Sequence, residues 1–190
     1  MNLPEGISID ENPPIAYPWM LIELIDGRYE RGLELLESGP SEVYDWQQFY
    51  YPKSLLRGQI YRLMGRSEMA RRSFEEARQT LEAYLQERFG DSRVHSALGL
   101  AYAGLGMTED AIKEGLRGVD LLPYQKDKFA GPFRLRDLAQ IYAIVGENDL
   151  ALENLEILVS LKSLIDLPEI LGDPTWIDLR DDERFQALGG

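Results

Sequence analysis

Few side chains in this sequence could do chemistry. The 190 residues include no cysteine and a single histidine, His95. Zinc sites draw on cysteine and histidine ligands, and hydrolytic triads need a histidine base, so this one imidazole would have to serve either kind of site. It stands two residues before Ala97, in a stretch with helical apolar spacing. We interpret His95 as a buried or interface histidine rather than as a catalyst.

Carboxylates are the remaining candidates. The adjacent pair Asp181 and Asp182 could in principle do acid–base work, but a solvated position is the better interpretation. A metal site would need oxygen ligands, and the segments DENPP and DLRDDE lack the glycine and the ligand spacing of a calcium loop. We therefore expect neither an enzyme nor a protein with a cofactor or metal. Activity lost on His95→Ala would contradict this expectation.

Composition also limits the partners. The formal net charge is −13, from 33 acidic and 20 basic residues. Nucleic acids and anionic membranes attract clustered lysine and arginine, so we expect no nucleic acid and no membrane as partner. The first residues lack a basic start followed by an apolar run, and no stretch approaches about 18 uninterrupted apolar residues. We expect an intracellular, cytoplasmic protein.

The elements that position the side chains follow from four regularly spaced glycines. Gly27, Gly65, Gly106 and Gly146 stand about 40 residues apart, and each separates two stretches with helical apolar spacing. Glycine at such a place accommodates the chain reversal between two antiparallel helices. Small residues five positions later and tyrosines four positions earlier recur with the same period. These residues are Gly32, Ala70, Ala111 and Ala151, and Tyr61, Tyr102 and Tyr142.

The predicted helix pairs carry further local signals. Ser67, Thr108 and Asn148 stand two residues after three of the glycines, where we expect them to cap the second helix. Gly115 and Gly118 would each cost about 1 kcal/mol relative to alanine in a helix that packs against nothing. We therefore place both at a close contact with a neighbouring helix. The predicted fold class is all-α, without any sheet.

The pattern resembles the tetratricopeptide repeat (TPR). The segment LGLAYAGLGMTEDAIKEGLRGVDLLP matches it best, RGQIYRLMGRSEMARRSFEEA and LAQIYAIVGENDLALENLEIL follow, and WMLIELIDGRYERGLELLESG is the weakest match. The resemblance implies a right-handed superhelix of antiparallel helix hairpins, a TPR-like α-solenoid. It divides the chain into an N-terminal extension, about four hairpins and a C-terminal capping segment. The predicted bounds are 1–12, then 13–45, 46–90, 91–129 and 130–165, and finally 166–190.

Residues 50–188 also resemble the TPR segments that accompany serine/threonine kinase, nucleotide cyclase or DNA-binding regulator domains in bacterial signalling proteins. The sequence contains no phosphate loop, no kinase catalytic-loop motif and no basic recognition helix. The resemblance implies a protein–protein interaction scaffold that binds a peptide or a partner helix in a concave groove. The alternative is self-association into homo-oligomers, for example a homodimer.

The predicted groove is the face formed by the first helix of each pair. Side chains roughly 3, 6 and 10 residues before each glycine should point toward it, together with those one turn further out. Arginines recur on this face, and they would either attract an acidic ligand or pair with carboxylates of the chain such as Asp137. We predict that these residues bind the partner: Leu55, Gln59, Arg62, Arg93, Ser96, Leu100, Phe133, Arg136 and Gln140.

The segment DWQQFYYPKS is rich in aromatic residues. Trp46, Phe49 and Tyr50 either form a sticky entrance to the groove or seal the first hairpin onto the second. Pro52 indicates a helix start or a kink.

A repeat array also needs a cover for its last apolar face. Trp176 and Phe185 are the candidates for that cover. We expect Asp181 or Asp182 to cap a short final helix.

Overall fold

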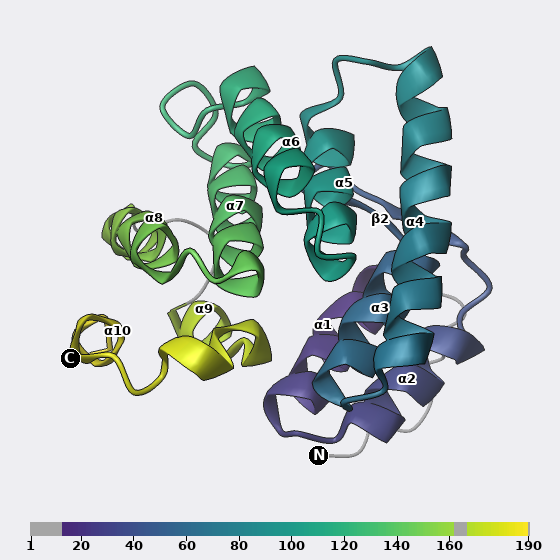
Figure 1. Ribbon diagram of the computed structural model, residues 1–190, viewed down its shortest axis with the longest axis horizontal. Coiled ribbons are helices and arrows are strands. Elements are labelled where there is room, and N and C mark those ends of the chain that lie inside the picture. The colour runs from purple at the N-terminus through teal and green to yellow at the C-terminus, as the bar shows by residue number, and fades with distance from the viewer. Residues whose placement is uncertain (1–12, 162–166, 190) are drawn as a thin grey trace.

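The computed structural model describes residues 13–161 and 167–189 of the chain, so the predicted extension 1–12 lies outside the described residues. The described part is mostly helical, and Figure 1 shows its helices succeeding one another along the molecule. Eight of them form four consecutive pairs. Their bounds are α1 (Pro13–Ile25) with α2 (Tyr29–Ser38), α3 (Lys53–Leu63) with α4 (Ser67–Glu87), α5 (Ser92–Gly104) with α6 (Thr108–Leu121), and α7 (Gly131–Val145) with α8 (Asn148–Ser160).

The turns within the pairs lie at the four predicted glycines. Gly27, Gly65, Gly106 and Gly146 have φ angles of 73°, 69°, 76° and 86°. A Cβ atom at any of them would meet nothing within 4 Å, so crowding does not explain the choice of glycine. The left-handed backbone conformation does, because residues with a Cβ adopt it at a cost. The prediction of helix pairs that turn at these glycines is confirmed.

The predicted caps of the second helices are wrong. Ser67, Thr108 and Asn148 are the first helical residues, and the residue before each, such as Arg66, occupies the N-cap position without a side-chain cap. The turn after the glycine is one residue shorter than we assumed, and its backbone closes the first helical turn, as in the bond from Ala70 N–H to the Arg66 carbonyl at 2.9 Å.

The two glycines within α6 lie at close helix contacts, as predicted. A Cβ at Gly115 would come within 2.7 Å of Cδ1 of Ile141 in α7. A Cβ at Gly118 would come within 3.1 Å of the Ser92 carbonyl oxygen in α5. Both distances are too short for van der Waals contact. Helix α6 therefore packs against both first helices that flank it, and a side chain at either glycine would force its neighbours to move.

A small hairpin contradicts the prediction of a chain without any sheet. Strands β1 (Val43–Asp45) and β2 (Tyr50–Pro52) pair antiparallel, with Tyr44 opposite Tyr51. Backbone bonds from Trp46 N–H to the Phe49 carbonyl and from Lys53 N–H to the Glu42 carbonyl flank the pair, each at 2.8 Å. This alternation places Pro52 at a non-hydrogen-bonded position, where its missing N–H removes no ladder bond. Helix α3 then begins directly after Pro52, as predicted.

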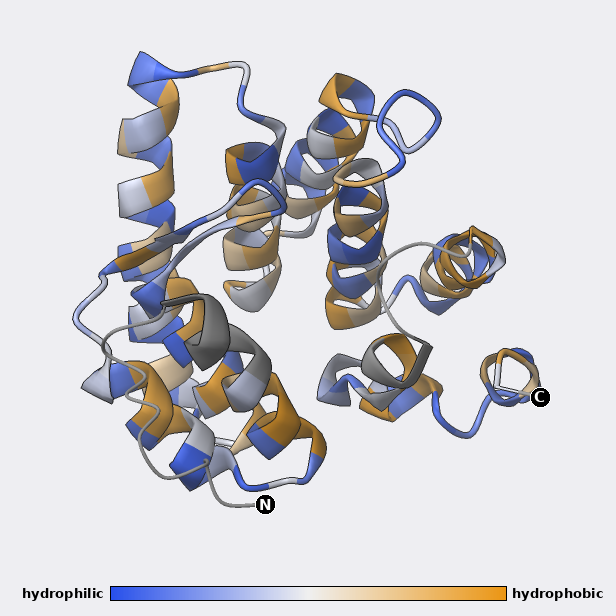
Figure 2. Cartoon of the chain, turned by 180° about the vertical axis from the view of Figure 1, so that it is seen from behind, coloured by the Kyte–Doolittle hydropathy of each residue, from blue (hydrophilic) through white to orange (hydrophobic). Residues whose placement is uncertain are grey.

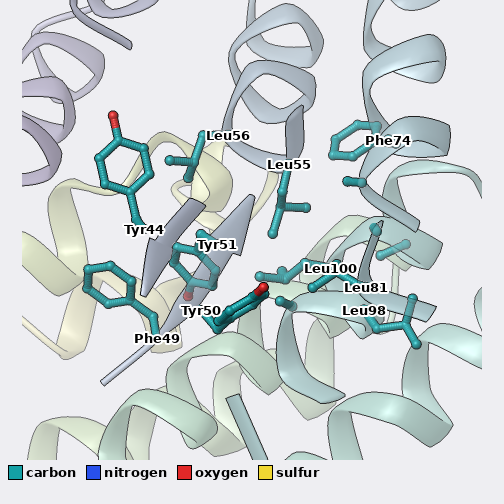
Figure 3. Packing of buried hydrophobic residues seen from close by; sticks show 14 of the residues in the cluster. Tyr44, Phe49, Tyr50, Tyr51, Leu55, Leu56, Phe74, Leu81, Leu98 and Leu100 are labelled. Atoms are coloured by element: carbon teal, nitrogen blue, oxygen red, sulfur yellow. The ribbon is translucent and has the colours of Figure 1, made fainter. Parts of the chain in front are cut away.

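The buried side chains of the described residues form two hydrophobic clusters. The hairpin belongs to the larger one, which runs from α1 to α6 and includes Ile141 of α7; Figure 3 shows part of it. Phe49 and Tyr50 are buried in it, and the half-buried ring of Trp46 stacks on Phe49 with the ring centres 5.8 Å apart. The rings of Tyr50 and Tyr84 of α4 lie 4.4 Å apart. Of the two interpretations of this aromatic segment, the structure favours the one in which it seals the first hairpin onto the second.

The second cluster joins α7 and α8 to the C-terminal elements. These are α9 (Leu167–Gly172), the 3-10 helix η2 (Pro174–Leu179) and α10 (Glu183–Ala187). Trp176 is fully buried there, and Phe185 is buried beside it, so both residues cover the last apolar face as predicted. Asp182 caps α10 by accepting the Arg184 N–H at 2.8 Å. Figure 2 shows hydrophobic and hydrophilic residues interleaved around the helices, as expected where one face of each helix is buried.

Candidate interaction site on the inner face

The inner face is the side of α3, α5 and α7 that carries the nine predicted groove residues. Five of the nine are buried, Arg136 and Gln140 among them, and three of the five belong to the core. Leu55, Ser96 and Leu100 are fully buried, and Ser96 lies where α5 approaches Gly118 of α6. Helical spacing correctly predicted the side of the helices on which they lie, but the β hairpin and α6 pack against that side.

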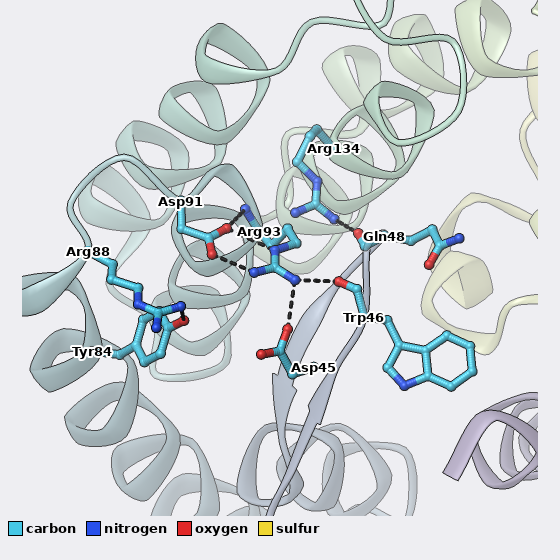
Figure 4. A network of polar contacts seen from close by, with 8 residues as sticks. All are labelled: Asp45, Trp46, Gln48, Tyr84, Arg88, Asp91, Arg93 and Arg134. Atoms are coloured by element: carbon cyan, nitrogen blue, oxygen red, sulfur yellow. Dashed lines mark hydrogen bonds and ion pairs between the residues drawn. The ribbon is translucent and has the colours of Figure 1, made fainter. Parts of the chain in front are cut away.

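Arg93 is held by the hairpin and by its own helix end (Figure 4). Its guanidinium donates to a carboxylate oxygen of Asp45 at 2.7 Å, to Asp91 at 2.6 Å and to the Trp46 carbonyl. The hydrogen bond to Asp91 is the main reason that the pKa of Arg93 is raised above its usual value. Arg93 therefore anchors the hairpin loop onto α5.

A second set of charges lies between the hairpin and α7. The Tyr51 hydroxyl donates to Oδ1 of Asp137 at 2.7 Å and accepts a hydrogen bond from Arg136 at 3.1 Å. Arg136 also lies 3.2 Å from Oδ1 of Asp137, and its guanidinium stacks 5.1 Å from the ring centre of Phe133. Pairing of Arg136 with Asp137 was one of the two alternatives for this arginine, and it is the one observed.

Arg134 is the residue of this set that sequence reasoning missed. It is fully buried, donates to the Gln48 carbonyl of the hairpin loop (Figure 4), and forms an ion pair with Oδ2 of Asp137 at 3.2 Å. Burial lowers the pKa of its guanidinium, and the charge of Asp137 opposes this. The spacing of Arg134 and Asp137, three residues apart on one helix, was the available signal. It did not reveal that a hairpin would cover them.

The remaining predicted residues, Gln59, Arg62 and Gln140, meet at one small hollow. Its volume is about 30 Å³, and it lies between α1, β2, α3, α7 and the start of η2. Nε2 of Gln140 donates to Oδ2 of Asp173 at 2.6 Å. Burial lowers the pKa of Arg62, while the charges of Asp173 and Asp178 oppose this. The sequence did not indicate that the C-terminal segment reaches the inner face.

Asp173 also borders a second hollow beside the first. This hollow, of about 10 Å³, is lined by Leu21, Ile25, Arg136 and Asp173. Arg62 of α3 and Arg136 of α7 therefore line two adjacent hollows that share the carboxylate of Asp173. Tyr51 of the hairpin lines the first hollow and contacts Arg136, so the hairpin reaches this part of the inner face as well.

His95 lies away from these hollows, between α5 and α6. Its Nδ1 is 2.6 Å from Oε2 of Glu114, and its Nε2 is 3.0 Å from the Phe89 carbonyl oxygen. Both ring nitrogens are thus engaged, which leaves neither to accept a proton from a substrate in this arrangement. A shallow hollow of about 690 Å³ lies along α6 beside His95 and is lined by that helix almost alone.

Within ranges 13–161 and 167–189, no three side chains of histidine, aspartate or glutamate gather as metal ligands would. In the same ranges no helix combines the length and the apolar character needed to cross a membrane. Comparison with family models, with curated proteins and with solved structures found no significant match.

Proposed function

We propose that this protein is a non-catalytic scaffold that binds a peptide or a helix of a partner protein on its inner face. The observation that carries the proposal is the convergence of Gln59, Arg62 and Gln140, from two helices far apart in the sequence, on a hollow that is partly lined by aliphatic side chains. Polar groups that fix orientation, set in an apolar surface, are typical of binding sites. Gln59 and Arg62 are partly exposed there, whereas Gln140 is buried.

The helix pairs support this function. Their regular turns and close contacts agree with the TPR resemblance, which implies a right-handed superhelix with a concave binding surface. We include that superhelix in the proposal, together with a cytoplasmic role in a bacterial signalling system. The engagement of both nitrogens of His95 supports a binding protein over an enzyme.

A photo-crosslinking experiment tests the proposal. The crosslinking amino acid p-benzoylphenylalanine replaces Gln59 on the inner face, and in a matched variant it replaces the exposed Lys113 on the outer face of α6. Both variants are irradiated in the cells of origin, and the adducts are identified by mass spectrometry. We expect a discrete partner at Gln59 and not at Lys113.

Other outcomes would contradict the proposal. Adducts at Lys113 alone would move the binding surface to the outer face. Adducts at Gln59 with a second copy of this chain would favour the self-association alternative.

A further inference from the structure

Arg62 differs from the other two predicted arginines of the inner face. Arg93 and Arg136 each form ion pairs with carboxylates of the chain. Among the described residues Arg62 has no such pair, and its Nε is buried without a hydrogen-bond partner. A buried guanidinium N–H that lacks an acceptor costs free energy, and an oxygen of a ligand would recover it.

The charges nearest to Arg62 belong to the C-terminal segment. Asp173 and Asp178 attract its guanidinium through space. However, both oxygens of Asp173 already accept hydrogen bonds, Oδ2 from Gln140 at 2.6 Å and Oδ1 from the Thr175 N–H at 2.8 Å. Asp173 is thereby fixed by α7 and η2, and the Nε of Arg62 is left without an acceptor.

The hollow beside Arg62 has the size and walls for an acidic side chain. A volume of about 30 Å³ accommodates roughly two water-sized groups, which corresponds to the two oxygens of a carboxylate. Half of its lining residues are apolar and aliphatic, and the other half are polar or charged. The aliphatic ones are Met20, Leu21, Leu24, Leu56, Leu63 and Pro174. The chain's own Asp173 and Pro174, an acidic residue followed by an apolar one, border the same hollow.

We propose that the hollow beside Arg62 binds the carboxylate of an acidic side chain in the partner peptide, with an adjacent aliphatic or proline residue against the walls. This rests on the proposed function, because it names the chemistry of the ligand at the same inner face. The Nε–H of Arg62 donates to that carboxylate. Asp173 weakens the contact by repulsion, since like charges at close range oppose binding.

Peptide titrations of the full-length, ¹⁵N-labelled protein test this directly. The probes are acetyl-Leu-Asp-Pro-Leu-amide and its Asn counterpart, and the readout is the Nε–Hε signal of Arg62. We expect the Asp peptide to shift this signal and the Asn peptide to leave it in place. In Asp173→Asn the Asp peptide should bind roughly two- to fivefold more tightly, because a competing charge is removed.

Two arginine variants control the experiment. Arg62→Gln should abolish the difference between the Asp and Asn peptides in affinity. Arg72→Gln, the same substitution at a highly exposed arginine of α4, should keep it. An unfolded Arg62→Gln would not remove the test, because the Nε–Hε signal and the Asp173→Asn variant report on the wild-type arginine.

Several results would overturn the proposal. Equal shifts with both peptides, or none with either, would exclude recognition of the acidic side chain. An Asn peptide with a free C-terminal carboxylate is a further probe. If it shifts the signal as much as the Asp peptide does, the hollow recognises the C-terminus of a chain rather than an acidic side chain. If crosslinking at Gln59 captures a partner while the peptides do not differ, the scaffold function stands and this inference fails. If the Asp peptide shifts the Nε–Hε signal of Arg62 while crosslinking at Gln59 captures no partner, the recognition of an acidic side chain stands and the scaffold function fails.

Discussion

Nδ1 of His95 lies 2.6 Å from Oε2 of Glu114, so that α5 and α6 are joined by an imidazole and a carboxylate. The second nitrogen faces the Phe89 carbonyl at 3.0 Å. Only the protonated ring can donate to both acceptors at once. The hydrogen bond to Glu114 is accordingly the largest cause that raises the pKa of His95 above its usual value of about 6.5, against the opposing effects of burial and of Arg117.

Because the chain has one histidine, the pKa of His95 can be followed by a single imidazole signal in proton NMR. We expect its midpoint above about 6.5 in the wild type, and a lower midpoint in Glu114→Gln. Glu109→Gln, at an exposed glutamate of the same helix, is the control and should leave the midpoint unchanged. A wild-type midpoint at or below the usual value would show that the contact with Glu114 is not maintained in solution.

The same contact predicts how stability depends on pH. A pKa that is raised in the folded state contributes stability that is fully present below the unfolded value of about 6.5 and is lost as the pH rises through the folded pKa. The difference in unfolding free energy between wild type and Glu114→Gln should therefore shrink as the pH increases. Urea unfolding at several pH values measures it, and a difference that grows with pH would contradict the prediction.

Ala111 tests the close packing of α6. It is fully buried, and its carbonyl lies where a Cβ at Gly99 of α5 would come within 3.0 Å. We expect Ala111→Leu to lower the unfolding free energy by about 1–3 kcal/mol, because the extra volume forces the helices apart. Glu109→Gln should change it by less than about 0.5 kcal/mol. Equal effects in denaturant unfolding would mean that Ala111 does not lie at a tight helix contact.

The sequence predicts the helix pairs better than it predicts what covers them. Glycines such as Gly106 are informative because their role depends on the local backbone, which needs a positive φ. Gly115 and Gly118 are informative because glycine destabilises a helix relative to alanine. Two glycines within one helix therefore indicate that a neighbouring helix comes close at those positions. These signals are local or periodic, so one sequence is enough to detect them.

The candidate site depends instead on contacts between distant residues. Arg134 meets Gln48, and Gln140 meets Asp173, across long stretches of chain. Helical spacing places Arg136 on the inner face without showing that Tyr51 of the hairpin approaches it. For this reason Arg136→Ala, which removes a side chain of 4% exposure from a charged cluster, should lower stability as well as affect binding. Arg62 is the better residue for a pure binding test.

The hairpin can be tested at its central cross-strand pair. Tyr51→Phe removes the hydroxyl that donates to buried Asp137 and accepts from Arg136. We expect a loss of about 1–3 kcal/mol in unfolding free energy, because a buried carboxylate loses a hydrogen bond. Tyr44, its partner across the strands, is equally buried, but its hydroxyl makes no hydrogen bond to the described residues. Tyr44→Phe should therefore cost less, and the opposite order would exclude the Tyr51 contact as an anchor of the hairpin.

The last prediction concerns the C-terminal segment that covers α7 and α8. Trp176 is fully buried in the second cluster, and its Nε1–H donates to the Ile170 carbonyl at 2.5 Å. Trp176→Ala should lower the unfolding free energy by about 3–5 kcal/mol, because it leaves a large cavity against α7 and α8. Its neighbour Ile177 is 57% exposed and provides the matched control, since Ile177→Ala removes apolar surface that is largely in water already. Thermal and urea unfolding measure both variants. A Trp176→Ala protein as stable as Ile177→Ala would show that the last helix pair does not depend on this segment as its cover.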